Sequence, residues 1–229
     1  MSENLVKLFL DQFYLPLYLF TWIISLIRYK RFFDTPLKYL PMLIIYTFFT
    51  ELLGYFIKYS DDFQFFSDER YAWHNVVIYN VYQLVFFLFF FGVYRKMLKK
   101  KSAKKWVLYM SVLCFLAYLT NAIFYNPLHN QTTYAHIVGS LMLVFVIVQY
   151  LIEKYHEENS QPLKFNLMFW ISIGLLIFYT SFSIILIFPI LKVNIGIQVY
   201  FRPVLVSSIA LMYGLIIIGL LVGKRKAFR

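Results

Sequence analysis

The chain of 229 residues is 61% hydrophobic, 22% aromatic and only 14% charged, and its formal net charge is +11. A soluble globular domain rarely has such a composition, so that class is excluded and a protein lying mostly within a lipid bilayer is expected. The positive charge does not indicate a nucleic-acid partner, because the basic residues border apolar segments instead of forming one basic face. The single cysteine, Cys114, lies inside an apolar segment, which excludes a disulfide framework and a cysteine-based metal site.

Seven apolar segments approach the roughly 20 residues that a helix needs to cross hydrocarbon. They predict an all-α fold, a polytopic membrane protein with one domain over residues 1–229, built as a seven-transmembrane-helix bundle. Asp11 and Pro16 crowd the start of the first segment, which could extend back to Leu5, and Pro16 should kink this helix or mark its start. The expected spans are Phe13–Ile27, Leu40–Ile57, Trp73–Tyr94, Trp106–Tyr125, Tyr134–Ile152, Phe165–Leu191 and Pro203–Val222.

Lysine and arginine accumulate in cytoplasmic loops, and this rule gives the expected orientation. With the N-terminus outside and the C-terminus inside, all but five of the 22 basic residues fall on the inner side of a bacterial inner membrane. The five exceptions are Lys7, Lys58, Arg70, Lys192 and Arg202. The basic loop of residues 95–105 follows from the same rule, but it could also dock anionic lipid or a cytoplasmic signalling partner. Such a partner would meet Arg95, Lys96, Lys99, Lys100 and Lys101.

The third segment has one polar face, and the segment before it contains an acid. At 100° per residue, one arc of the third segment holds five polar or half-polar residues, Asn75, Tyr79, Asn80, Tyr82 and Gln83. Glu51 and Asn80 both lie about 10 Å below the outer membrane edge, so they are expected to face each other. A carboxylate facing lipid there would cost several kcal/mol. Glu51 should therefore turn inward and be protonated, or accept hydrogen bonds from Asn80, Gln83 or Tyr79.

Polar groups of the other segments gather in the same outer half, which predicts a polar pocket open to the extracytoplasmic side. The candidate ligand-binding residues are Glu51, Asn75, Tyr79, Asn80, Gln83, Asn121, His136 and Arg202. Each has a structural alternative. The amides can bond between helices, His136 can be a satisfied histidine near the interface, and Glu51 can belong to an ion pair. Arg202 can pair with Glu51 or extend to lipid headgroups.

Catalytic and cofactor chemistry finds little support in the sequence. A retinal site needs a lysine in the middle of the last span, and residues 203–222 contain none. The phenylalanine-rich run of residues 86–91 covers every side of a helix, so it indicates lipid contact and interhelical packing and not a cofactor site. No motif of a metalloprotease, serine hydrolase or nucleotide-binding protein occurs. We therefore expect no catalytic residues, no metal site and no cofactor.

Three short motifs resemble a known group of proteins. They are Glu51-Leu52-Leu53-Gly54, then His74-Asn75, and then Tyr79-Asn80-Val81-Tyr82-Gln83 before an aromatic run. Together with the hydropathy profile of the whole chain, they resemble uncharacterised seven-span integral membrane proteins of Bacteroidota. The resemblance implies no established activity, although some such proteins look like partners of signalling kinases.

The sequence thus favours a sensor or receptor-like module that signals through a partner, since its inner loops are too short for a kinase or cyclase domain. A small proton-coupled transporter that uses Glu51 is the alternative, and an intramembrane enzyme is a third possibility. Transport would give proton-coupled flux in vesicles, whereas an enzyme would turn over lipid or a small amide without a partner.

Overall fold

The computed structural model describes residues 13–64, 66, 68, 75–157, 162–191 and 198–225. In these ranges all regular structure is helical. Four short 3₁₀ helices, η1 to η4, accompany the α-helices α2 (Tyr14–Ile27), α3 (Leu40–Tyr59), α4 (Val76–Met97), α5 (Lys101–Phe124), α6 (Thr133–Tyr155), α7 (Leu167–Ile190) and α8 (Gln198–Val222).

Six of these helices, α3 to α8, are long and apolar enough to cross a membrane, which supports the prediction of a multi-pass helical membrane protein. α2 is apolar but has only 14 residues, which gives it a length of about 21 Å. Its predicted extension toward Leu5 lies outside the described residues. Pro16 occupies the first turn of α2, where a proline is tolerated, so it marks the start of the helix as expected.

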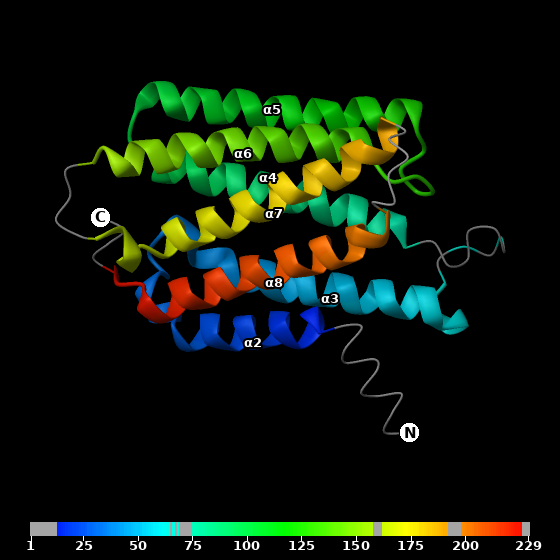
Figure 1. Ribbon diagram of the computed structural model, residues 1–229, viewed down its shortest axis with the longest axis horizontal. Coiled ribbons are helices and arrows are strands. Elements are labelled where there is room, and N and C mark those ends of the chain that lie inside the picture. The colour runs from blue at the N-terminus through cyan, green and yellow to red at the C-terminus, as the bar shows by residue number, and fades with distance from the viewer. Residues whose placement is uncertain are drawn as a thin grey trace.

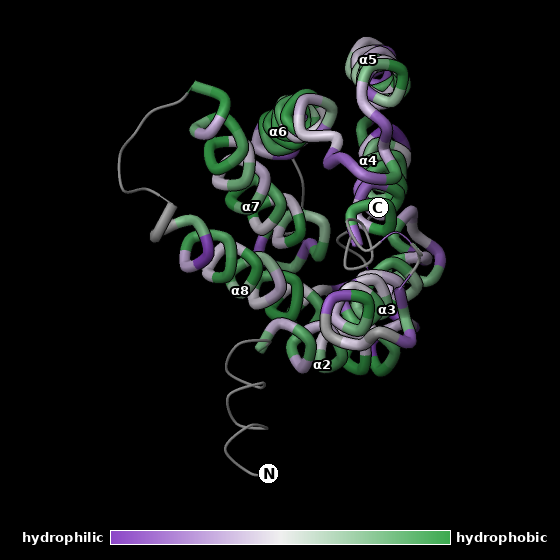
Figure 2. Tube along the Cα trace, turned by 90° about the vertical axis from the view of Figure 1, so that its right-hand side faces the viewer, coloured by the Kyte–Doolittle hydropathy of each residue, from purple (hydrophilic) through white to green (hydrophobic). Residues whose placement is uncertain are grey.

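The helices run roughly along one common direction (Figure 1). Seen from the end of the bundle in Figure 2, α4, α3, α2, α8, α7 and α6 follow one another around a ring, and α5 lies outside it against α4 and α6. Helices distant in the sequence therefore become neighbours: α2 packs on α8, and α4 packs on α6. Because of this order, one face of each of the helices α2, α3, α4 and α8 packs toward the centre of the ring.

α4 is the most aromatic wall of this interior. Phe87, Phe90 and Phe91 are at most 1% exposed, so most of the phenylalanine-rich run packs between helices and does not face lipid. Another stripe of this helix is exposed, with Val81, Val85 and Leu88 at the surface. A single helix can bury aromatic side chains on two sides because α4 has α3 on one side and α5 and α6 on the other.

The ends of α7 and α8 are fixed by specific hydrogen bonds. Asn166 caps α7, since its side chain accepts a hydrogen bond of 2.9 Å from the Met168 N–H. At the C-terminus of α8, Arg31 donates to the carbonyls of Leu221 and Gly223 at 3.2 and 2.9 Å. A cation at that position also interacts favourably with the helix dipole. These contacts join the α2–α3 connection to the last span at one end of the bundle.

Candidate functional site

Glu51 lies on α3 and turns toward α4, inside the bundle. Its Oε2 atom accepts a hydrogen bond of 2.9 Å from the Tyr79 hydroxyl. Both side chains are only partly buried. Of the three donors that the sequence offered to Glu51, the structure thus selects Tyr79.

Gly54 sets the distance between α3 and α4 at this point. A Cβ atom on Gly54 would lie 2.5 Å from the Tyr79 hydroxyl oxygen, so only glycine lets the tyrosine pass over α3 to reach Glu51. The Asn75 side-chain amide donates a hydrogen bond of 3.0 Å to the Gly54 carbonyl, one helical turn before Tyr79. The start of α4 is thereby fixed to the C-terminal half of α3, and Tyr79 is positioned on the acid.

Three further tyrosines lie near enough to Glu51 to interact with it electrostatically, and they are missing from the sequence-based candidates. Tyr18 of α2, Tyr82 of α4 and Tyr213 of α8 interact electrostatically with the carboxylate. All three are buried, and the rings of Tyr18 and Tyr213 have centroids 4.5 Å apart. Thr47, one turn before Glu51, shares a hydrogen bond of 3.1 Å with the Tyr82 hydroxyl. Tyrosines of α2, α4 and α8 are therefore the nearby groups that the sequence-based candidates lack.

Asn80 does not face Glu51, and that prediction was wrong. Its amide nitrogen donates to the carbonyls of Pro127 and Asn130 at 2.7 and 3.0 Å. Its carbonyl oxygen accepts from both the N–H and the hydroxyl of Thr132. All hydrogen-bonding capacity of this buried side chain is thus directed to the connection between α5 and α6, because a step of 100° from Tyr79 turns it to the other side of α4.

The other amide candidates serve different helix pairs. Asn121 is buried, and its Oδ1 accepts a long hydrogen bond of 3.4 Å from the Ala135 N–H, which links α5 to α6. The buried Gln83 Oε1 has no hydrogen-bond partner among the described residues. Asn75, Asn80 and Asn121 therefore form the interhelical hydrogen bonds that were the structural alternative for them.

His136 is 1% exposed, so its side chain points into the bundle. Neither of its ring nitrogens has a hydrogen-bond partner in the described part of the structure, and the same is true of the Ser140 and Ser183 hydroxyls. Its ring packs against Tyr118 and Phe182, with centroids at 5.7 and 6.3 Å. Buried groups of this kind in proteins are usually paired with ordered water.

Arg202 lies in the first turns of α8 and is exposed. None of the ion pairs among the described residues joins it to Glu51. Of the eight candidates, Glu51 and Tyr79 share a direct contact, Asn75 supports it, and Asn80, Asn121 and His136 contact other parts of the bundle. Among the described residues, no hydrogen bond or ion pair joins Gln83 or Arg202 to Glu51.

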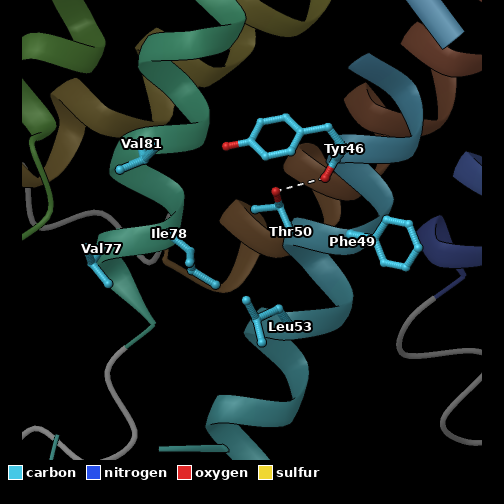
Figure 3. Close-up of a pocket in the computed structure, with 7 residues that line it drawn as sticks. All are labelled: Tyr46, Phe49, Thr50, Leu53, Val77, Ile78 and Val81. Atoms are coloured by element: carbon cyan, nitrogen blue, oxygen red, sulfur yellow. Dashed lines mark hydrogen bonds between the residues drawn. The ribbon is translucent and has the colours of Figure 1, made fainter. Parts of the chain in front are cut away.

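Two grooves among the described residues are apolar and face outward. Figure 3 shows the one between α3 and α4, which has a volume of about 320 Å³. The Thr50 hydroxyl inside it is already bonded to the Tyr46 carbonyl at 2.9 Å. The second groove, of about 430 Å³, lies between α5 and α6 and includes Asn121. Apolar clefts between membrane helices suit lipid chains, so neither groove is the polar pocket expected from the sequence.

The basic loop is anchored to the end of α6. Glu153 accepts hydrogen bonds from the backbone N–H groups of Lys99 and Lys100, at 2.5 and 3.4 Å. Glu157 pairs with Lys99 and Lys154. Burial alone would raise the pKa of the Glu157 carboxyl, but the hydrogen bonds and charges of Lys154 and Lys99 outweigh it and lower that pKa. The two acids lie beside the N-terminus of α5, where negative charge is favourable.

The five basic side chains that the sequence analysis assigned to a cytoplasmic partner are all exposed. They are Arg95, Lys96, Lys99, Lys100 and Lys101.

One signal in the sequence could have indicated the missing tyrosines. Tyr14 and Tyr18 lie four residues apart and thus on one helical face, and Tyr213 lies in the middle of an otherwise apolar span. A tyrosine at such a depth needs a partner for its hydroxyl.

Comparison of the chain with protein-family models, with curated proteins and with solved structures gives no match, so the functional argument rests on the geometry around Glu51.

Proposed function

We propose that the protein is a seven-span sensor or receptor-like module of the bacterial inner membrane, with a ligand site at Glu51 that opens to the extracytoplasmic side. The observation that carries this proposal is the environment of Glu51. Its carboxylate accepts a hydrogen bond from Tyr79 of the neighbouring helix α4, and the residue as a whole is half-buried. An ionisable group within a membrane is costly to maintain and usually serves a function.

The proposed topology counts α2 as the seventh span, with the N-terminus outside and the C-terminus inside. The distribution of basic residues supports it, because Arg31, Lys99, Lys154 and Arg225 are contributed by segments at one end of the bundle. Cytoplasmic loops carry such an excess of positive charge. The outer half of the bundle then contains Glu51 and the start of α4.

A signal would leave through the opposite end. The connection between α4 and α5 has only three residues, Leu98 to Lys100, which leaves no room for a catalytic domain there. The exposed side chains of Arg95, Lys96, Lys99, Lys100 and Lys101 offer a positive surface to an acidic partner. α4 carries Tyr79 near its start and this surface near its end, so a change at Glu51 that shifts α4 would reach the partner.

A small proton-coupled transporter is the second candidate, and the same acid favours it. Intramembrane carboxylates mark proton and ion pathways in transporters. The two functions differ in outcome: a transporter moves solute across a membrane without a partner protein, whereas a receptor binds its ligand at equilibrium without flux.

The test compares the wild-type protein with Glu51→Gln, which keeps the shape of the side chain and removes its charge. Both are purified in mild detergent, and co-purifying small molecules are identified by mass spectrometry. We expect at least one molecule that raises the melting temperature of the wild type and is absent from Glu51→Gln. If every bound molecule is retained by the variant, the proposal fails.

Reconstituted vesicles then separate the two candidates. Uptake of that molecule driven by a pH gradient, and abolished in Glu51→Gln, would favour the transporter. Binding without uptake would favour the receptor, as would co-purification of a kinase that is lost when Lys99, Lys100 and Lys101 are replaced by glutamine.

A further inference from the structure

Three buried polar side chains of α6 and α7 have no hydrogen-bond partner among the described residues. They are His136 and Ser140 of α6 and Ser183 of α7, and the unpaired atoms are both ring nitrogens of the histidine and both hydroxyl oxygens. The exposed fractions of the three residues are 1%, 0% and 3%. Burying a polar group without a hydrogen bond is destabilising, and such groups in proteins are nearly always paired. A partner other than the described protein groups is therefore required.

The two serines differ from the other buried hydroxyl residues of the described helices. A serine or threonine inside a helix commonly donates a hydrogen bond to a carbonyl of the preceding turn. The buried residues that do so here are Thr21, Ser25, Thr47, Thr50, Ser172 and Ser208. Ser140 and Ser183 form no such bond. Their hydroxyls are thus free of their own helices and available to a bound molecule.

The three side chains lie where α6 and α7 pack against each other. Ser140 follows His136 by one turn of α6, so the two share a helical face. The ring of His136 packs against Phe182 of α7 with the centroids 6.3 Å apart, and Ser183 is the next residue of that helix. Tyr118 of α5 covers another side of the histidine, with its ring centroid at 5.7 Å. Aromatic rings from two neighbouring helices therefore shield the polar groups.

The hydrogen-bonding capacity of this group matches water. A neutral imidazole has one donor and one acceptor nitrogen, and each serine hydroxyl both donates and accepts. Buried water also donates and accepts, and it typically makes about three hydrogen bonds to groups that otherwise lack partners. A lipid chain offers no hydrogen bond. A metal ion fits less well, because the described residues contain no group of three histidines, cysteines or acids that could hold one.

We propose that ordered water binds among His136, Ser140 and Ser183 and joins α6 to α7 by hydrogen bonds. Water-mediated hydrogen bonds are nearly as favourable in enthalpy as direct ones, so this water stabilises the contact between the two helices. The proposal does not involve Glu51, and it stands or fails independently of the ligand site proposed there.

Radiolytic footprinting tests this proposal, because X-rays convert bound water into hydroxyl radicals that oxidise the side chains beside it. The full-length protein in lipid nanodiscs is irradiated, and oxidation of each residue is measured by mass spectrometry and divided by its rate in the denatured protein. The references are Tyr94 and Tyr150, which are 0% and 1% exposed and whose hydroxyls are bonded to protein side chains. We expect His136 to be oxidised several times faster than either tyrosine.

Variants then show which groups hold the water. Replacing both Ser140 and Ser183 by alanine removes two hydroxyls with little change in volume, and the oxidation rate of His136 should fall severalfold, to near that of the two tyrosines. Ser208→Ala is the matched control, because it removes a buried hydroxyl that is bonded within its own helix. This variant should leave the rate of His136 unchanged. Melting temperatures confirm that each variant is folded, and the two single alanine variants replace the double variant if it is not.

Three outcomes would overturn the proposal. In the first, His136 is oxidised no faster than the two reference tyrosines, which would mean that no water lies beside it. In the second, its rate is the same with and without the hydroxyls of Ser140 and Ser183, so that these serines do not hold the water. In the third, Ser208→Ala lowers the rate as much as the loss of those two hydroxyls does, so that the effect is not specific to this site.

Discussion

At the scale of single residues, the position of Glu51 could be predicted and its full set of partners could not. The cost of exposing a carboxylate to lipid requires it to face inward, whatever the fold. Tyr79 and Asn80 are consecutive, so they point 100° apart. Which of the two reaches Glu51 depends on where α3 lies relative to α4, and the structure places α3 on the side of Tyr79.

The close contact at Gly54 gives a prediction at the same scale. Gly54→Ala would place a methyl group 2.5 Å from the Tyr79 hydroxyl oxygen, so the tyrosine must move off Glu51. Such overpacking typically costs about 1–3 kcal/mol, which exceeds the helix-propensity gain of about 1 kcal/mol from replacing glycine by alanine. We expect a lower free energy of unfolding, measured in detergent, and weaker Glu51-dependent ligand binding.

Gly92→Ala is the matched control on α4, because a Cβ atom there meets nothing within 4 Å. Only the propensity gain applies, and this variant should be as stable as the wild type or slightly more stable. If Gly54→Ala behaves in the same way, Tyr79 is not held against Glu51 as the structure describes.

At the scale of helices, the hydropathy pattern located each element well. Predicted spans and helices agree within a few residues, for example Leu40–Ile57 against α3 and Tyr134–Ile152 against α6. The helix starts differ most in the fourth and last spans: α5 begins at Lys101 instead of Trp106, and α8 begins at Gln198, so that Pro203 lies in its interior. A proline near the start of a helix removes few hydrogen bonds, so the polar turn before it can still be helical.

The packing of α7 on α8 supports a prediction at this scale. A Cβ atom on Gly174 would lie 3.0 Å from the backbone oxygen of Met212, so the two helices pack closely at this point. Gly174→Leu must push α8 away, and overpacking of this kind costs about 1–3 kcal/mol. We expect a clear fall in melting temperature, measured by intrinsic fluorescence.

Gly214→Leu is the comparison for α8, because the position has open space within 4 Å. It should leave the melting temperature nearly unchanged. Since Gly214 immediately follows Tyr213, this variant also shows whether α8 as a whole tolerates a large residue near the Glu51 site. Equal losses in the two variants would mean that α7 and α8 do not meet at Gly174.

At the scale of the whole molecule, charge distribution and connectivity support a definite topology. In the proposed seven-span topology the two termini lie on opposite sides, with the short α4–α5 connection inside and the α3–α4 connection outside. The basic residues joined to Glu153 and Glu157 lie at the end that this proposal makes cytoplasmic.

Reporter fusions test this topology. Alkaline phosphatase, which is active only outside the cytoplasm, should be active when fused after residue 64 and inactive when fused after Lys100 or Arg225. A fluorescent protein at the last position should be bright. An active phosphatase after Lys100 would reverse the orientation and place the basic loop outside, where it could not meet a cytoplasmic partner.

The sequence by itself determined the membrane class, the positions of the helices and the inward placement of Glu51. These properties follow from apolar length, helical period and the cost of a charge in hydrocarbon, all of which are local. Only the tertiary structure decided that Tyr18 and Tyr213 pack against each other and that Asn80 serves the α5–α6 connection. The reason is that the order of helices around the bundle depends on how their surfaces fit together, and no periodicity within one segment specifies its neighbour.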